Sequence, residues 1–163
     1  MNATTRQDVR KLFANIVDLW EVRRPGPGLL PSRADFEMAD FKPWLGWVSI
    51  YDIDYGDAIR FKIRLAGTQV THIERANNTG RYLDEVFPPD KYPGVFEPYF
   101  EALAEKQPVY LQRTVPTLMG YPQVLSKLVL PVAADGHRPD KFINILHYSD
   151  TLDHEELAEP LII

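Results

Sequence analysis

Most reactive side chains in this sequence lack the spacing that catalysis or metal binding requires. No serine lies in a Gly-x-Ser-x-Gly context, so nothing indicates a nucleophile elbow. His137, His147 and His154 are dispersed, and their spacing is not that of a metal site. Asp84 and Glu85 are neighbours on an expected helix and point in different directions, which favours a helix cap and a surface charge over acid–base catalysis. The sequence predicts neither a catalytic centre nor a metal site.

Arg113 is the position at which the sequence points most directly to chemistry. It shares one face of an expected strand with Val109, Leu111 and Val115. A cation within an otherwise apolar wall needs an anionic partner, because burying an unpaired charge is costly. We expect a structural ion pair with an Asp or a Glu. The alternative is a carboxylate or phosphate ligand, which an arginine binds with two parallel hydrogen bonds.

The composition excludes several classes of function. The chain has 163 residues, enough for one domain, and no cysteine, which rules out disulfides, thiolate catalysis, cysteine-bound zinc and iron–sulfur clusters. The net charge of −5 argues against non-specific nucleic-acid binding, which needs a basic surface. No apolar run approaches the length of a membrane span, and the N-terminus lacks a signal-peptide pattern. We therefore expect a cytoplasmic protein that binds neither nucleic acid nor membranes.

Five segments have the composition and alternation of β-strands. The expected strands are residues 47–53, 59–65, 109–115, 123–132 and 141–148, with a tight turn at 54–57 between the first two. In the second strand apolar residues alternate with Arg60, Lys62 and Arg64, which indicates one buried face and one solvated cationic face. The fourth strand is apolar on both faces and must therefore be covered on both.

Helical segments are expected on either side of the first two strands. Residues 93–106 place their apolar side chains within one arc, and three glutamates spaced by four lie opposite, toward solvent. Ser32, with Asp35 three residues later, resembles the N-cap of a short helical segment that runs toward Phe41.

The N-terminal segment, residues 6–22, shows the clearest amphipathic pattern. Its apolar stripe is expected to pack on the domain core. Part of the stripe is also a candidate for contact with a second copy of the chain or another partner. These contact candidates are Leu12, Phe13, Ile16 and Trp20.

The order of elements is helix, two strands, several short helices and three strands. It predicts an α+β domain in which a five-stranded antiparallel sheet carries helices on one face and the N-terminal amphipathic helix on the other.

Three phrases of the sequence and this order of elements resemble a known family. The phrases are LPSRADF at 30–36, RLAGT at 64–68 and TGRYLDE at 79–85. They resemble the PAS domain, in particular a branch of short, stand-alone bacterial PAS proteins, mainly alphaproteobacterial, formerly classed as a domain of unknown function. The resemblance runs from about position 20 to position 148 and implies three parts. These are an N-terminal helix at 1–24, a PAS core at 25–150 and a C-terminal tail at 151–163.

The resemblance implies that residues 68–106 form the helical wall of a cavity against the inner face of the sheet. Polar side chains from this wall and from the strands are the candidates for contact with a ligand. They are His72, Arg75, Tyr82, Tyr99, Tyr110, Arg113, Lys127 and His147.

The identity of any ligand stays open, and a small organic molecule is possible. A PAS photosensor that uses flavin needs a cysteine near residues 78–82, and this chain has none, so photochemical flavin binding is not expected. A PAS domain that binds haem needs a histidine on the helical wall. His72 is the one candidate, and a lone histidine there is more often a polar or surface residue, so haem is not expected either.

The resemblance implies a sensor or interaction module without enzymatic activity. Such a module would form a homodimer and act in signal transduction through contact with a signalling protein such as a histidine kinase. Two alternatives remain. One is a small cone-shaped α+β enzyme of the isomerase or dehydratase type, and the other is an interaction scaffold that binds no ligand.

Overall fold

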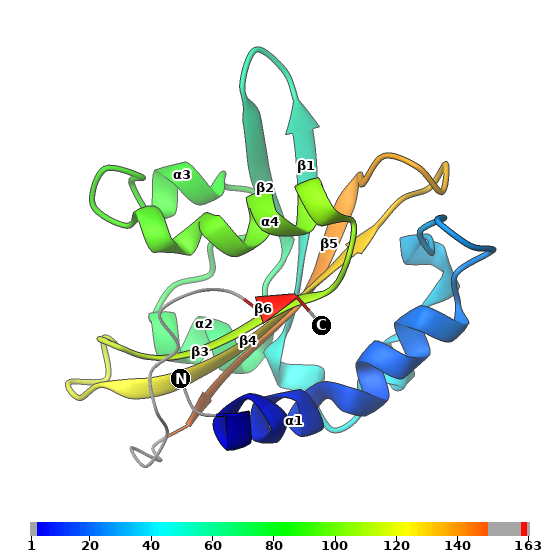
Figure 1. Ribbon diagram of the computed structural model, residues 1–163. Helices are drawn as coiled ribbons and strands as arrows, with labels where there is room; N and C mark the ends of the chain where they lie inside the picture. The colour runs from blue at the N-terminus through cyan, green and yellow to red at the C-terminus, as the bar shows by residue number, and fades with distance from the viewer. Residues whose placement is uncertain (1–2, 150–160, 163) are drawn as a thin grey trace.

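One antiparallel sheet forms the centre of the structure, and helices cover both of its faces (Figure 1). The computed structural model describes residues 3–149 and 161–162, and for residues 3–10 and 161–162 only the backbone. The strands are β1 (Val48–Tyr55), β2 (Ile59–Leu65), β3 (Val109–Val115), β4 (Gln123–Val132), β5 (Lys141–Ser149) and β6 (Leu161–Ile162). Their order across the sheet is β2-β1-β5-β4-β3-β6.

The helices match the predicted order. The α-helices are α1 (Ala3–Val22), α2 (Thr68–Glu74), α3 (Leu83–Val86) and α4 (Glu97–Glu105). Four 3₁₀ turns accompany them: η1 (Arg33–Asp35), η2 (Met38–Phe41), η3 (Leu45–Trp47) and η4 (Pro93–Val95). The predicted α+β architecture with a five-stranded antiparallel sheet is confirmed, and the two-residue β6 extends that sheet at the β3 edge.

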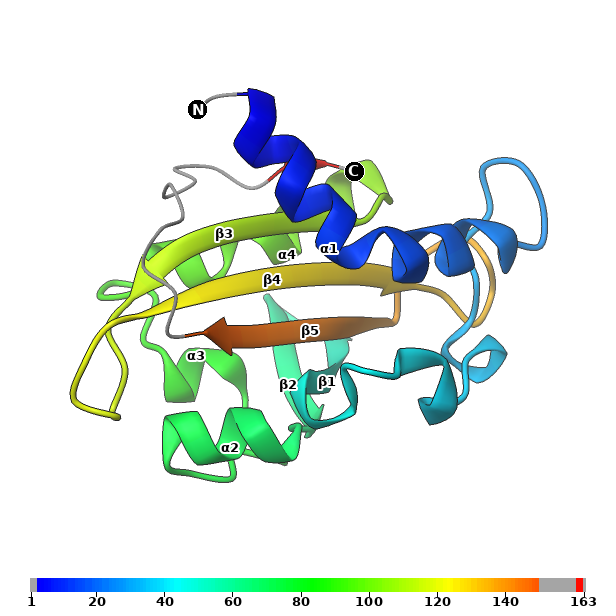
Figure 2. The ribbon, with the colours of Figure 1, turned by 90° about the horizontal axis from the view of Figure 1, so that it is seen from below.

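The outer face of the sheet is a closely packed apolar core. Figure 2 shows α1 crossing β3 and β4 on this face. Phe13, Ile16 and Trp20 are at most 3% exposed, and they pack with Leu128 and Leu130 of β4. The Trp20 indole Nε1 also donates a hydrogen bond of 2.9 Å to the Pro131 carbonyl, so its one polar atom is satisfied. The prediction that the apolar stripe of the first helix packs on the core is confirmed.

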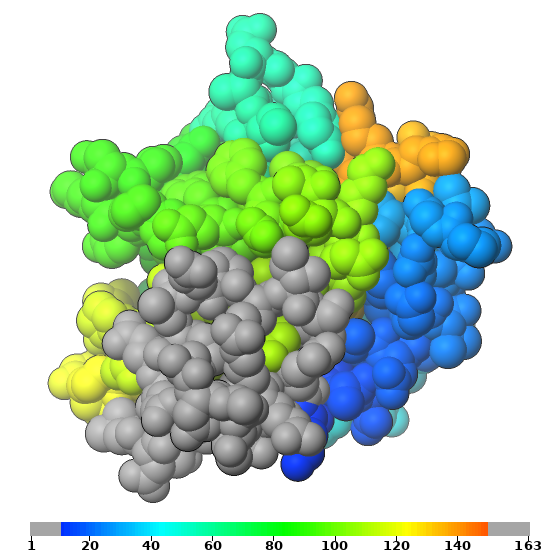
Figure 3. Space-filling model, in the orientation of Figure 1, coloured from blue at the N-terminus to red at the C-terminus, as the bar shows by residue number. Residues whose placement is uncertain are grey.

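The inner face is covered by α2, α3, α4 and the loops between them. Tyr99 and Ala102 of α4 pack against Val109 of β3 and Val129 of β4. In Figure 3 the surfaces of α3 and α4 lie beside the β1–β2 hairpin, which protrudes from the molecule. The helices between the second and third strands therefore form the wall that the sequence predicts.

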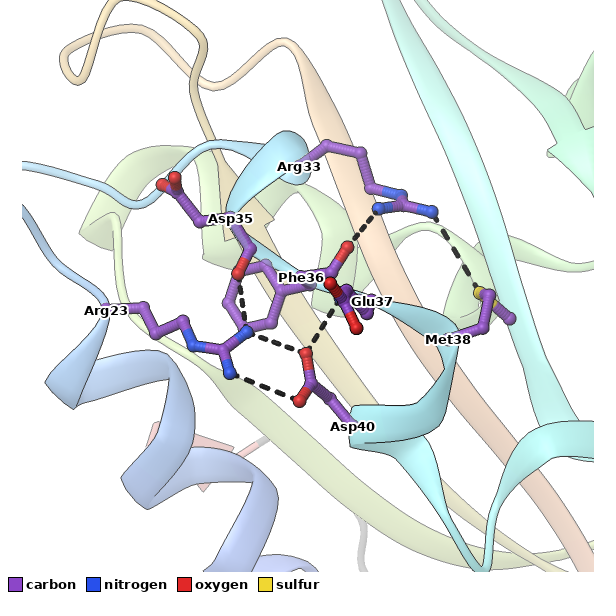
Figure 4. Close-up of polar contacts among 7 residues, drawn as sticks. All are labelled: Arg23, Arg33, Asp35, Phe36, Glu37, Met38 and Asp40. Atoms are coloured by element: carbon purple, nitrogen blue, oxygen red, sulfur yellow. Dashed lines mark hydrogen bonds and ion pairs between the residues drawn. The ribbon is translucent and has the colours of Figure 1, made fainter.

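The segment between α1 and β1 is tied down by charged groups (Figure 4). The Arg23 guanidinium donates two hydrogen bonds to the Asp40 carboxylate, at 2.6 and 3.1 Å. Ser32 and Asp35 form the predicted capping box at η1. Asp40 belongs to η2, and it also accepts a hydrogen bond from the Glu37 amide. The Arg23–Asp40 pair therefore joins the end of α1 to η2.

Several predicted boundaries need correction. β1 continues to Tyr55, so the hairpin turn lies at Gly56, Asp57 and Ala58 and not at 54–57. The helical segment toward Phe41 consists of two separate 3₁₀ turns, η1 and η2, and each begins with its own capping box. Of the tail predicted at 151–163, residues 151–160 and 163 lie outside the described residues, and Leu161–Ile162 form β6.

The cations of β2 are partly paired. Arg60 contacts Asp84 at 2.6 Å, and its guanidinium lies 3.7 Å from the centroid of the Tyr82 ring. Arg64 contacts Asp52 at 2.6 Å. The predicted solvated face is therefore a set of surface ion pairs. Within residues 3–149 and 161–162, no helix has both the length and the apolar character that crossing a bilayer requires.

Candidate functional site

A cavity of about 310 Å³ lies between the inner face of the sheet and the helical wall. Four strands and the segment from α2 to α4 contribute to it, so residues far apart in the sequence meet there. Most of its lining is aromatic or aliphatic. These lining residues include Tyr51, Leu83, Phe87, Tyr92, Val95, Tyr99, Leu125, Leu146 and Tyr148.

The register of β3 and β4 brings two cations into this apolar cavity. Arg113 of β3 is paired with Leu125 of β4, and Lys127 follows Leu125 on the same face of the strand. Diagonal neighbours of this kind are about 7–8 Å apart at Cα, within the reach of long side chains. Both side chains line the cavity.

Lys127 is the more deeply buried of the two cations. Its side chain is 6% exposed, and its Nζ lies 4.7 Å from the centroid of the Tyr99 ring. Burial and, secondly, the charge of Arg113 lower the pKa of Lys127 to about 7, although Glu74 acts in the opposite direction. The ammonium is therefore held in a place that disfavours its charge.

Arg113 has no carboxylate partner. Its Nη2 donates a hydrogen bond of 3.3 Å to the Gly94 carbonyl, and its buried Nε has no partner. A Cβ at Gly94 would lie 2.7 Å from Nη1, so the guanidinium occupies space that only a glycine leaves free. In the part of the chain that the structure describes, no Asp or Glu lies within 4.0 Å of Arg113. The expected structural ion pair is therefore wrong for these residues, and an anionic ligand is the alternative that remains.

Glu74 is the one carboxylate among the residues that line this cavity. It belongs to the last turn of α2, and its carboxylate accepts a weak hydrogen bond of 3.4 Å from Asn78. Burial raises the pKa of Glu74, while the Asn78 hydrogen bond and the charge of Lys127 lower it by less. The lining thus combines an acid that burial makes weaker with a lysine that burial makes less basic.

A second hollow of about 440 Å³ adjoins the first on the side of α2. The two share Glu74, Phe87, Tyr92, Pro116 and Tyr148 as lining residues. Leu118, which is 66% exposed, and Tyr92, which is 47% exposed, stand at its rim.

Asn144 is a further buried polar residue of the inner face. It lies on β5 between Phe142 and Leu146, is 0% exposed, and is paired with Val129 and Ser49 of the neighbouring strands. Neither its amide nitrogen nor its amide oxygen has a hydrogen-bond partner. An unsatisfied buried amide is costly, so the inner face carries polar groups that packing alone does not explain.

A larger hollow of about 670 Å³ lies on the surface beside α4. Its lining includes Ile59, which is 41% exposed, and Phe100, which is 45% exposed. Phe100, an apolar residue of the helix predicted at 93–106, is therefore not buried. Because its lining is solvated, we place the candidate site in the enclosed cavity and not in this groove.

The structure brings three of the eight predicted ligand contacts together in the cavity: Tyr99, Arg113 and Lys127. His72 and Arg75 are exposed on α2 and do not line it. Arg75 caps that helix in the left-handed region, with φ of 53°. The prediction that His72 and Arg75 face the cavity is therefore wrong.

The other three predicted contacts also lie elsewhere. The Tyr82 hydroxyl donates a hydrogen bond of 2.8 Å to Asp54 at the β2 edge. Tyr110 is buried in the outer core beside α1. His147 packs edge-on against Trp44 and Trp47 on the outer face, where burial lowers its pKa. Alternate residues of a strand point to opposite faces of the sheet. Tyr110 and His147 each lie one residue from an inward-facing neighbour, so both point to the outer face.

The predicted partner contacts on α1 divide into two groups. Phe13, Ile16 and Trp20 are buried in the outer core of their own chain. Leu12 is 39% exposed. Of these four residues, only Leu12 offers an apolar surface to a second molecule.

Tyr51, Glu74 and Tyr148 are among the cavity residues that escaped the sequence-based prediction, and so did Asn144, which is buried nearby. Parity was an available signal for two of them, because Asn144 and Tyr148 share a face of β5 with Phe142 and Leu146. Glu74 had no comparable signal. Its position depends on the short α2 and on how that helix docks. No group of three or more His, Asp or Glu side chains in the described ranges could hold a metal ion.

Comparison with known proteins connects this geometry to a family. A family model described as PAS domain matches residues 10–147. Among solved structures, the Rhodobacter sphaeroides LOV protein is similar over 94% of this chain and 71% of its own, with 10% identity and a TM-score of 0.49. A variant of RsLOV gives 11% identity, coverage of 94% and 72%, and a TM-score of 0.50. A fungal LOV domain photoreceptor gives 17% identity, coverage of 90% and 95%, and a TM-score of 0.44. No curated protein matches this chain.

Proposed function

Because this chain belongs to the PAS domain family, we propose that it is a single-domain sensory or protein-interaction module of bacterial signal transduction. Its input is a small molecule bound in the inner cavity. Its output is contact with another protein, such as a histidine kinase. The observation that carries the proposal is the enclosed apolar cavity into which Arg113 and Lys127 project without a carboxylate partner.

Lys127 is 6% exposed and the Arg113 Nε is buried, and neither cation has a carboxylate within 4.0 Å among the described residues. This arrangement supports ligand binding better than a purely structural role. A packed core excludes such groups because their desolvation is costly. A binding site keeps them because the ligand supplies the missing partner. Apolar walls with a few convergent polar groups are the usual form of a small-molecule site, and a volume of about 310 Å³ is at the lower end of the common range of about 300–1,000 Å³.

Native mass spectrometry of the purified protein tests the proposal. We expect a mass above that of the bare chain, which returns to the bare value after denaturation. Val95→Trp, which fills the cavity, should abolish the additional mass. The matched control is Val22→Trp at the exposed end of α1, where the side chain is 80% exposed, and it should retain the additional mass. A bare chain in every sample, with no small molecule raising its melting temperature, would exclude the sensor and favour the scaffold.

A second candidate function is a small acid–base enzyme, and Glu74 favours it. A buried carboxylate with a raised pKa and a lysine with a pKa near neutrality line the same cavity. Such pKa values suit proton transfer. If the retained molecule is recovered chemically unchanged after incubation with fresh protein, the sensor is supported. If wild-type protein changes its mass and Glu74→Gln does not, the enzyme is supported.

The homodimer is proposed to form through the exposed side of α1 around Leu12, since Phe13, Ile16 and Trp20 are buried. Light scattering on the wild type and on Leu12→Lys checks it. A dimer that Leu12→Lys converts to monomer supports this surface, and an unchanged dimer places the contact elsewhere.

A further inference from the structure

Two positive charges face each other across one corner of the cavity. Arg113 and Lys127 line the same cavity, and the charge of Arg113 adds to burial, the larger cause, in lowering the pKa of Lys127. Their strands set this proximity, because the two positions are diagonal neighbours in the β3–β4 register. Repulsion between buried like charges disfavours the empty site.

No group of the described chain neutralises this pair. Glu74 attracts Lys127 through space, but it makes no ion pair with either cation within 4.0 Å. Its side-chain contact is with Asn78. Moreover, burial raises the pKa of Glu74, which weakens it as a counter-charge. The corner therefore carries an excess of positive charge that an anion would relieve.

The donor geometry suits a carboxylate. The Arg113 guanidinium already gives Nη2 to the Gly94 carbonyl, and its buried Nε remains free. Lys127 adds an ammonium with three donors and no hydrogen-bond partner in the part of the chain that is described. A planar carboxylate accepts hydrogen bonds from both groups, and charge-assisted bonds of this type are the strong ones.

The remaining lining indicates which chemical character the rest of the ligand, beyond its charged group, should have. Beyond the charged residues Arg113, Lys127, Lys91 and Glu74, the walls are mostly aromatic and aliphatic, with Phe87, Tyr99 and Leu146 among them. Such walls desolvate an apolar group favourably.

We propose that the cavity binds a small organic acid, with its carboxylate between Arg113 and Lys127 and its apolar body against the aromatic and aliphatic walls. This proposal rests on the proposed sensory function and narrows it to one class of ligand.

Matched pairs of probes test the charge requirement. Phenylacetate and isovalerate are the carboxylates, and phenylacetamide and isovaleramide have the same shape without the charge. Calorimetric titration at pH 7 should show at least one of the carboxylates binding at least about tenfold more tightly than its amide, because one charge-assisted hydrogen bond is worth that much. Phenyl phosphate forms a third arm. If it binds more tightly than phenylacetate, the site is one for phosphate and the proposal fails.

Three variants locate the charge requirement. Arg113→Met and Lys127→Met should each remove the preference for carboxylate over amide, and Arg113→Lys, which keeps the charge without the fork, should retain part of it. Lys42→Met, on an exposed lysine away from the cavity, should bind as the wild type does. Circular dichroism confirms that each variant is folded. A preference that survives both methionine variants overturns the proposal.

Native mass spectrometry separates this proposal from the one on which it rests. If the protein retains a neutral molecule that Val95→Trp excludes, the sensory function stands and the carboxylate does not. If none of the carboxylates binds and nothing is retained, both proposals fail.

Discussion

The two faces of the sheet differ in how they satisfy their buried groups. On the outer face, α1 packs onto β4 with side chains that are almost wholly apolar, and the Trp20 indole finds its acceptor in the Pro131 carbonyl. On the inner face, the Arg113 Nε and the Asn144 amide are buried without hydrogen-bond partners, and Lys127 lines the cavity without a carboxylate within 4.0 Å among the described residues. The same strands therefore build an outer face whose packing stabilises the fold and an inner face whose unsatisfied polar groups lower stability. Selection for stability alone does not produce the second arrangement.

Matched phenylalanines give the largest expected contrast between the faces. Phe13 is 0% exposed in the outer core, so Phe13→Ala should lower the free energy of unfolding by about 3–5 kcal/mol. Phe87 is partly buried and lines both inner hollows, so Phe87→Ala removes contacts on one side only and should cost about 1–2 kcal/mol. Urea unfolding measures both values. Equal costs would mean that the inner face is packed as tightly as the outer one.

This contrast also explains how much the sequence could reveal. Alternation along β2 and β3 predicts which side chains point inward, and for Arg113 it was sufficient, because Val109 and Val115 share its face. The same alternation explains why the prediction that Tyr110 contacts a ligand was wrong. Tyr110 lies one position from Val109 on β3, so its side chain points to the outer core. Parity thus carries real information about the sheet, provided that it is applied to every polar candidate.

The helical wall could not be read in the same way. The position of Glu74 depends on where α2 ends, and a seven-residue helix has too few turns to show a reliable apolar face. The absence of a partner for Arg113 is likewise a matter of tertiary packing. Many acidic residues are present in the chain, and only the fold shows that none of those described lies within ion-pair distance of Arg113 or Lys127. The family phrases predicted the fold, whereas only the structure showed that Arg113 and Lys127 lack a carboxylate within ion-pair distance among the described residues.

Lys127→Met tests whether the inner face is strained by charge. The pKa of Lys127 falls from an ordinary value of 10.5 to about 7 on folding, so the unfolded chain binds more protons between these values. Stability should therefore rise with pH across this window. Removing the ammonium should stabilise the ligand-free protein at pH 7 by about 3 kcal/mol and flatten the pH dependence. Lys42→Met, on an exposed side chain, should leave stability and slope unchanged.

The neighbours of Lys127 do not obscure this measurement. Burial raises the pKa of Tyr51, Tyr99 and Tyr148, so these hydroxyls stay neutral below pH 10. Glu74, whose pKa is raised above 4.5, and Lys91 are the other ionisable groups that line the cavity, and the double variant Glu74→Gln with Lys127→Met removes the contribution of Glu74. A wild-type protein whose stability is flat or falls from pH 7 to pH 10 would contradict the strained lysine.

Asn144→Leu tests the neutral part of the same face, with a smaller effect. The side chains are similar in size, and neither amide atom of Asn144 has a partner, so the substitution should stabilise the protein by about 1–2 kcal/mol. Asn78→Leu is the matched control. Asn78 is also buried, but it donates to Glu74 and accepts from Arg81, so its loss should destabilise. Destabilisation by Asn144→Leu would show that the amide is satisfied in solution, and the face would then be less strained than its contacts indicate.

The Arg23–Asp40 contact should give the smallest effect, because it is a partly exposed ion pair outside the core (Figure 4). The hydrogen bond from Arg23 and then that from the Glu37 amide lower the pKa of Asp40 below its ordinary 3.8. A carboxylate with a lowered folded-state pKa contributes stability above its unfolded value, and that stability is lost as the pH falls through the folded one. Asp40→Asn should therefore lower the urea midpoint at pH 6, by less than Asn144→Leu changes it, and the difference from wild type should shrink toward pH 2.

Asp57→Asn, at the exposed tip of the β1–β2 hairpin, is the control for Asp40→Asn and should change the midpoint little at either pH. Added salt should reduce the Asp40 effect at pH 6, because exposed charges are screened. It should leave the slope due to Lys127 nearly intact, because that group is 6% exposed. If salt removed both effects equally, Lys127 would be as solvated as the surface pair, and the inner face would differ from the outer one in shape alone.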